Sequence, residues 1–192
     1  VTEQASQRFV LNAALACMPA AMLGLAFYQQ IKQYLFGPLT VAWALIVGGF
    51  VILLIERFAP QPDTLKIKDM DWKHALKIGF AQTVSLIPGV SRAGATIMGG
   101  VVFGLSRRAA TEFSFFLAIP IMFAATAFDV YSSRDLLSWQ DANLFLVGFI
   151  TAFVGALIVV KGLLRYVAHH DFRIFAWYRI IFGVLVLTYF WK

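Results

Sequence analysis

Five long apolar runs constrain this chain more than any other feature of its sequence. They occupy residues 9–31, 37–55, 109–128, 142–160 and 174–191, and the only charged residues inside them are Glu112 and Arg179. A helix needs about 20 mainly apolar residues to cross the hydrocarbon core of a bilayer. Since 60% of all residues are hydrophobic and only 14% are charged, the composition excludes an ordinary soluble domain. We predict an all-α, polytopic membrane protein with about five spanning helices, forming a single membrane domain over residues 1–192.

Two shorter apolar runs, residues 78–90 and 93–106, lie between the second and third long runs. Each is too short to cross a bilayer by itself, which is typical of re-entrant or buried segments. The stretch that joins them reads PGVSRAG and carries Arg92 at its centre. We therefore predict a re-entrant helical hairpin over about residues 73–106, with its tip at residues 88–94.

The distribution of basic residues supports this topology. If the hairpin returns to its own side, one face of the membrane receives eleven of the 16 Lys and Arg residues, and the other face receives three. The eleven are Arg8, Arg57, Lys66, Lys68, Lys73, Lys77, Arg107, Arg108, Lys161, Arg165 and Arg173. Such a bias marks the cytoplasmic face. It also accounts for the net charge of +6 without a nucleic-acid partner, and we predict none.

Arg92 is the predicted centre of function. An arginine at membrane depth costs at least about 2.5–3.5 kcal/mol unless it is paired, so we expect an anionic partner. Pro88 and Gly89 end the first hairpin helix, and Ser91 is a suitable N-cap for the second. The free N–H groups and the positive dipole end of the second helix would then face the tip. Together with the planar guanidinium, these donors predict a site for a phosphate group.

The predicted site contains eight residues in two roles. Ser91 and Arg92 are the predicted catalytic residues. The predicted substrate-binding residues are Gln82, Gly89, Val90, Gly94, Ala95 and Thr96. A plainer alternative stays open, in which Arg92 pairs with a buried carboxylate and only holds the hairpin together.

Three further features have structural interpretations. Arg108 and Glu112 have the i,i+4 spacing of a helix-face ion pair. Arg179 lies about 9 Å along its predicted helix at about 1.5 Å per residue, and we expect it to snorkel to the cytoplasmic edge. Gly148, Gly155 and Gly162 recur every seven residues, which predicts a closely packed helix face.

The stretch FAQTVSLIPGVSRAGATIMGG, followed by GLSRRAATEFSFFLAIP, resembles the bacterial undecaprenyl-diphosphate phosphatases of the UppP/BacA type. The resemblance extends through VGFITAFVGAL and the closing YRIIFGVLV. It implies two inverted-topology repeats, each with a re-entrant hairpin whose tip reaches a central cavity. It also implies a multi-pass protein of the bacterial inner membrane. The implied activity hydrolyses a polyprenyl diphosphate lipid to its monophosphate, with a divalent cation, Mg²⁺ or Ca²⁺, and a homodimer is compatible with this family.

Two departures limit what the resemblance implies. Ala93 stands where the family pattern has a second serine, and the glutamate-rich motif of the family's N-terminal hairpin does not occur in this sequence. We therefore expect that this chain holds the arginine half of the site, that the ligands of the cation lie outside it, and that it is poorly active by itself. No metal ligand is predicted within the chain.

Two other functions stay open at this stage. Broken helices whose N-termini face an anion also form the central sites of secondary transporters, so a lipid-phosphate or anion transporter would use the same hairpin. A binding module that holds a lipid diphosphate without hydrolysing it is the third possibility, and the missing acidic motif is compatible with it.

Overall fold

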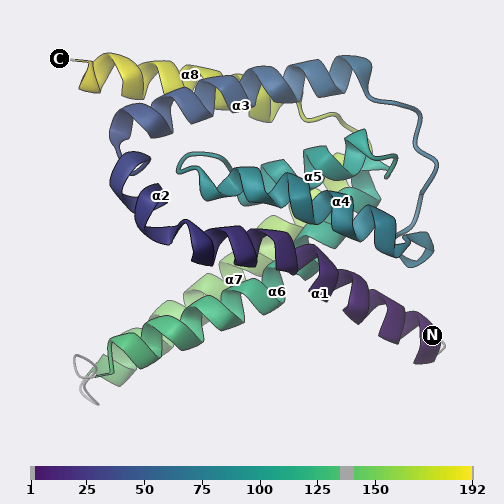
Figure 1. Ribbon diagram of the computed structural model, residues 1–192, viewed down its shortest axis with the longest axis horizontal. Helices are drawn as coiled ribbons and strands as arrows, with labels where there is room; N and C mark the ends of the chain where they lie inside the picture. Colours follow the sequence, from purple (N-terminus) through teal and green to yellow (C-terminus); the bar gives the residue numbers. More distant parts are fainter. Residues whose placement is uncertain (1–2, 135–140, 192) are drawn as a thin grey trace.

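The computed structural model describes residues 3–134 and 141–191, and every regular element within these ranges is a helix. Eight α-helices follow one another along the chain (Figure 1). They are α1 (Glu3–Ala26), α2 (Tyr28–Tyr34), α3 (Pro38–Phe58), α4 (Trp72–Thr83), α5 (Arg92–Val102), α6 (Arg107–Ser132), α7 (Ala142–Val167) and α8 (Arg173–Phe190). Five of them, α1, α3, α6, α7 and α8, are long and apolar enough to cross a membrane. The all-α fold and the five predicted spans are therefore confirmed.

The first span ends earlier than its apolar run. Its helix stops at Ala26, and Phe27 has φ −112° and ψ 18° before α2 begins. In Figure 1 the short helix α2 leaves the line of α1 and leads up to the start of α3. The residues that follow Phe27, including Gln29 and Gln30, thus belong to a separate segment. Hydropathy could not detect this change of direction because both segments are helical.

The paired helices α3 and α8 form one layer, and the hairpin α4–α5 lies between them and α1 (Figure 1). Close packing depends on small residues here. A Cβ at Gly49 would lie 2.5 Å from Ile180 Cγ1, and one at Gly183 would lie 2.7 Å from Ile46 Cγ1. The largest fully buried apolar side chains, Phe113, Ile78, Leu105 and Leu117, come from the hairpin and α6. The core therefore surrounds the hairpin.

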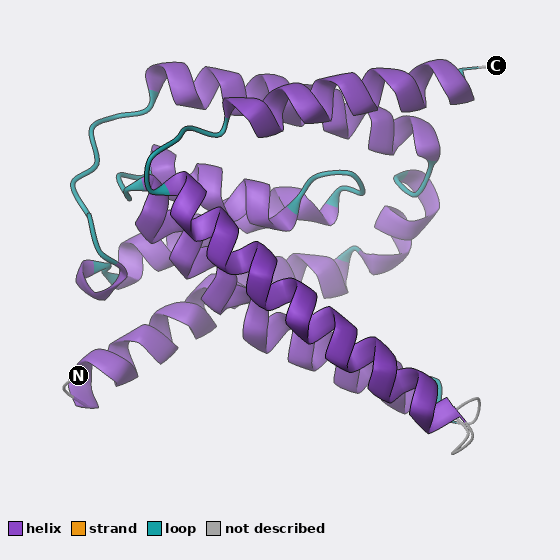
Figure 2. Cartoon of the chain, turned by 180° about the vertical axis from the view of Figure 1, so that it is seen from behind, coloured by secondary structure: helices purple, strands orange, loops and turns teal. Residues whose placement is uncertain are grey.

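The helices α6 and α7 extend together away from the other helices (Figure 2). The prediction for the glycines of α7 is wrong within the described residues. A Cβ at Gly148, Gly155 or Gly162 would meet no atom within 4 Å. Spacing by seven places these glycines on one helix face but cannot tell whether another helix packs there.

The two outer ends of the hairpin meet at the same end of the helical bundle. The backbone N–H groups of Asp63 and Thr64, in the segment between α3 and α4, donate to Gly104 O at 3.0 and 3.1 Å, and Ser106 N–H donates to Thr64 O at 2.9 Å. These contacts join the segment that leads into α4 to the residues just after α5. They close the helical pair at the end away from its tip, and its re-entry into the membrane stays a prediction.

A buried carboxylate fastens three helix ends next to this base. The Glu56 side chain at the end of α3 is only 1% exposed and pairs with Arg107 at the start of α6. It also accepts a hydrogen bond from Phe172 N–H, just before α8, at 3.1 Å. The ion pair predicted from the i,i+4 spacing is confirmed, since Arg108 Nε lies 2.9 Å from Glu112 Oε1.

Candidate active site

The hairpin tip is built by a proline, a glycine and a helix cap. Helix α4 ends at Thr83, and a short 3₁₀ turn, Val84–Leu86, leads to the extended residue Ile87 with ψ 121°. Pro88 explains this conformation, because a proline disfavours the helical region for the residue before it. Gly89 has φ +93°, a backbone conformation that residues with a Cβ rarely adopt. The chain can thus reverse direction within a few residues.

Ser91 caps α5 as predicted. Its Oγ accepts a hydrogen bond from Gly94 N–H at 3.0 Å, and its carbonyl accepts one from Ala95 N–H at 2.8 Å. The first N–H groups of a helix have no partner inside the helix, so the amides of Arg92 and Ala93 remain available at the tip. They carry the positive end of the α5 dipole. The tip is therefore a donor-rich end suited to an anion.

Arg92 lies at this helix start without a carboxylate partner. Its side chain is half-buried and close enough to the Cys17 thiol of α1 to interact with it electrostatically. Its Nη1 atom is buried and has no hydrogen-bond partner in the described part of the chain. No ion pair joins Arg92 to an acid within that part. The alternative in which a buried carboxylate locks Arg92 therefore finds no support among residues 3–134 and 141–191.

The prediction for Arg179 is wrong, because this side chain does not snorkel to the cytoplasmic edge. Its Nη2 donates to Ala44 O on α3 at 3.1 Å and to Gly89 O at the tip at 3.0 Å. Gly48 makes room for it, since a Cβ there would lie 2.6 Å from Arg179 Nη2. The turn and α3 offer carbonyl acceptors inside the protein, so the guanidinium needs no aqueous edge. Arg179 is the site residue that the sequence analysis missed.

The predicted substrate-binding residues fall into two groups. Val90, Gly94 and Ala95 line a cavity next to the tip, together with Ser91. Gly89 is covered by α3, where a Cβ would lie 2.7 Å from Val41 Cα.

The two remaining polar residues face away from this cavity. Thr96 is buried, and its hydroxyl is 2.7 Å from Ser114 Oγ of α6. Gln82 is 2% exposed and donates to Ala16 O of α1 at 3.5 Å, while its Oε1 has no partner among the described residues. The structure thus brings Ser91, Gly94 and Ala95 together with Arg179, and it places Thr96 and Gln82 behind them.

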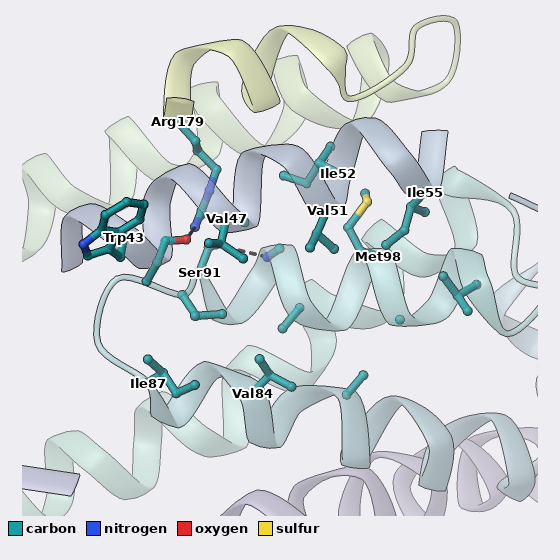
Figure 3. Close-up of a pocket in the computed structure, with 18 of the residues that line it drawn as sticks. Trp43, Val47, Val51, Ile52, Ile55, Val84, Ile87, Ser91, Met98 and Arg179 are labelled. Atoms are coloured by element: carbon teal, nitrogen blue, oxygen red, sulfur yellow. Dashed lines mark hydrogen bonds between the residues drawn. The ribbon is translucent and has the colours of Figure 1, made fainter. Parts of the chain in front are cut away.

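The cavity occupies about 660 Å³ between α3 and the hairpin. Figure 3 shows Arg179 extending from α8 toward the end of the cavity at which Ser91 lies, while Val51, Ile52, Ile55 and Met98 line its other end. One face of α5 forms a wall through Ser91, Gly94, Ala95, Met98, Gly99 and Val102. These positions follow the i, i+3, i+4, i+7 pattern of a helix face. The same pattern is visible in the sequence, and it distinguishes this face of α5 from the face that carries Arg92 and Thr96.

The donor set of the tip fits an anion and does not fit a divalent cation. It consists of amide N–H groups, guanidinium groups and a hydroxyl, whereas Mg²⁺ and Ca²⁺ bind carboxylate and carbonyl oxygens. No group of three or more His, Cys, Asp or Glu side chains suited to a metal ion occurs within the described ranges. Any cation would have to be held by residues other than those of this tip.

Comparison with known proteins identifies the relatives of this chain. Residues 1–185 match the family described as bacitracin resistance protein BacA. A protein of Nitrosospira multiformis named undecaprenyl-diphosphatase is 60% identical over 186 residues, which cover 97% of this chain and 68% of that protein. One of Nitrosomonas eutropha with the same name is 59% identical, over 95% of this chain and 67% of its own length. The chain thus spans about two thirds of each relative. A match over residues 1–185 together with this level of identity shows that the chain belongs to the BacA family.

Proposed function

We propose that this protein hydrolyses undecaprenyl diphosphate to undecaprenyl phosphate and inorganic phosphate at the hairpin tip, in the inner membrane of a bacterium. The names of its close relatives support the substrate and the reaction. The observation that carries the proposal is the buried, unpartnered Nη1 of Arg92 beside the free end of α5. Since the buried Nη1 of Arg92 has neither an acid nor a carbonyl partner among the described residues, the diphosphate group of a membrane lipid is a fitting partner.

The chemistry of the tip supports particular roles for its residues. Water attacks the terminal phosphorus, the bond from that phosphorus to the bridging oxygen breaks, and the bridging oxygen leaves on the lipid monophosphate. Arg92 and the first amides of α5 would neutralise the charge on the terminal phosphoryl oxygens. Ser91 already accepts from Gly94 N–H, so its own hydroxyl hydrogen is available to orient a phosphate oxygen.

The tip supplies binding groups but not a complete catalytic site. Hydrolysis needs a positioned water and, in this enzyme class, a divalent cation that would supply further positive charge at the phosphate. The residues at the tip are donors, and Ala93 adds no hydroxyl. We therefore place the ligands of Mg²⁺ or Ca²⁺ and the group that activates water outside this chain. The chain by itself is expected to turn over slowly or not at all.

The experiment measures phosphate release from undecaprenyl diphosphate in detergent with a divalent cation. It compares the chain alone, the chain with a separately expressed N-terminal repeat of a relative, and Arg92→Ala in both settings. Arg108→Ala is the matched control, because the Arg108 side chain is exposed and forms an ion pair with Glu112. Activity that appears with the repeat, survives Arg108→Ala and disappears in Arg92→Ala supports the proposal.

Three outcomes would contradict parts of it. Full turnover by the chain alone would overturn the half-site assignment. Movement of labelled lipid diphosphate across vesicle membranes without phosphate release would favour the transporter, which needs the same anion-binding helix end. Lipid diphosphate binding that depends on Arg92, with neither transport nor phosphate release, would favour a binding module that does not hydrolyse its ligand.

A further inference from the structure

The cavity between α3 and the hairpin has walls that are almost entirely apolar. Val47, Val51 and Ile55 line it from α3, Val84 lines it from the turn after α4, and Met98 and Val102 line it from α5. Its volume of about 660 Å³ falls within the range of about 300–1,000 Å³ that is usual for ligand pockets. The cavity is thus suited to hold part of an apolar molecule.

The cavity also opens toward the surroundings of α3. Val47 is 55% exposed, Val51 is 44% exposed and Trp43 is 49% exposed on this wall. All three belong to a helix that is long and apolar enough to cross a membrane. A chain longer than the cavity could therefore continue sideways into the lipid without passing through water.

Only one end of the cavity is polar. Ser91 and Arg179 lie there, and Arg179 Nε is buried without a hydrogen-bond partner in the described part of the chain. Nη2 of the same guanidinium donates to two carbonyls, so Arg179 brings a positive charge to this end while Nε keeps a free donor. An occupant with an anionic head and an apolar tail complements this charge distribution.

We propose that this cavity binds the part of the prenyl chain next to the diphosphate, with the head group at the end formed by Ser91 and Arg179. The inference rests on the proposed function, since it assigns the tail of the same substrate. Ser91 links the two sites, because it caps the helix that carries Arg92 and also lines the cavity. The opposite face of the hairpin offers no equal space, as Thr96 and Gln82 are packed against α6 and α1.

The direct test is photocrosslinking in detergent micelles, on the chain combined with the separately expressed N-terminal repeat. The probe is a prenyl diphosphate with a diazirine in its first isoprene unit. Labelling is expected at Val47, Val51 and Met98, and unlabelled farnesyl diphosphate should compete with it. Farnesol, which has the same tail without the charged head, should compete at least about tenfold more weakly, a difference of about 1.4 kcal/mol.

A pair of tryptophan variants makes the test specific. Val51→Trp fills the cavity, whereas Leu54→Trp adds the same side chain to the same helix at an exposed position outside the cavity. Labelling should fall about tenfold in Val51→Trp and stay unchanged in Leu54→Trp. Both variants must elute as the wild type in size-exclusion chromatography. If Val51→Trp fails to fold, Val47→Trp replaces it, and the wild-type labelling pattern remains decisive by itself.

The failure of this inference differs from the failure of the proposed function. Phosphate release with labelling spread over the exposed faces of α7 and α8, without competition by farnesyl diphosphate, would overturn the tail site and keep the hydrolase. Labelling at Phe175 and Tyr178 instead would assign the tail to the smaller cavity of about 250 Å³ that shares Ser91 and Arg179. Cavity labelling without phosphate release would support the tail site and contradict hydrolysis.

Discussion

Replacing Glu56 by glutamine is expected to destabilise the protein strongly, although Glu56 is far from the hairpin tip in the chain. Its carboxylate accepts hydrogen bonds from Arg107 Nε at 3.1 Å, from Arg107 Nη2 and from Phe172 N–H at 3.1 Å. Glutamine keeps one acceptor oxygen and turns an NH₂ group toward the remaining donors. The Arg107 guanidinium then lacks its counter-charge.

The structure sets the size of the expected loss. Breaking a buried ion pair by removing one partner costs about 3–5 kcal/mol. Because the Arg107 side chain is 40% exposed, water can recover part of this cost, and we expect about 2–4 kcal/mol in the free energy of unfolding. That corresponds to a factor of about 30 to 1,000 in the ratio of folded to unfolded protein.

The assay is unfolding by SDS in mixed micelles, followed by circular dichroism. Glu112→Gln is the matched control, because it removes the same charge from a pair whose Arg108 side chain is 68% exposed. Exposed helix pairs contribute about 0.3–0.5 kcal/mol. Equal, small shifts for Glu56→Gln and Glu112→Gln would refute the reasoning that burial, and not charge alone, sets the strength of the Glu56 contact.

Three further predictions concern the tip, the base of the hairpin and helix packing. Arg179→Met removes the hydrogen bond to Gly89 O at the tip and the one to Ala44 O of α3 that anchors the same guanidinium. Each is worth about 1.5–3 kcal/mol, so the tip amides should exchange hydrogen at least about tenfold faster by mass spectrometry. Unchanged exchange would contradict this role of Arg179. Asp71→Ala removes the N-cap of α4 and should cost about 1 kcal/mol in the free energy of unfolding at neutral pH, while Asp71→Asn should keep the cap and lose only the part that depends on the carboxylate charge. The hydrogen bond from His74 N–H lowers the pKa of Asp71, so the charged cap stabilises the fold at pH values above the unfolded-state pKa. The difference in stability between the wild type and Asp71→Ala should therefore narrow as the pH falls through the lowered pKa. A difference that does not change with pH would exclude a role for the carboxylate charge. Gly183→Ala should destabilise the protein by about 1–3 kcal/mol through overpacking against α3, whereas Gly148→Ala should stabilise α7 by about 0.5–1 kcal/mol. Both changes can be measured by the same SDS denaturation assay. Equal shifts in the free energy of unfolding for the two variants would contradict the packing of α8 against α3.

The sequence was sufficient to predict the features of the fold that depend on neighbouring residues alone. The five spanning helices follow from the lengths of apolar runs, and the N-cap at Ser91 follows from residue type next to a Pro-Gly turn. Arg179 could not be placed this way, because its two acceptors lie 135 and 90 positions away in the chain. Only the tertiary arrangement brings α3, the tip and α8 together.

The candidate site was predictable in part for the same reason. The residues of the turn were identified by their chemistry, but the sequence could not show that the buried Thr96 hydroxyl is engaged by Ser114 Oγ of α6, 2.7 Å away. Thr96 lies four positions after Arg92, so both point to one face, while Ser91, Gly94 and Ala95 point to the other. The glycines of α7 show a different limit of sequence-based prediction. Their regular spacing places them on one helix face, but it does not show whether another helix packs against that face.

The hairpin is supported at both of its ends, which changes how the tip responds to distant changes. Hydrogen bonds to Gly104 O hold its base, and Arg179 holds Gly89 O at its tip. A hairpin fixed only at its base would let small bends of α4 and α5 move the tip by amounts that grow with its length. With the second support, the position of Ser91 is set by α8 as much as by the hairpin itself. A C-terminal fusion or truncation that disturbs α8 would therefore act on the hairpin tip directly, although Arg179 lies 90 residues further along the chain than Gly89.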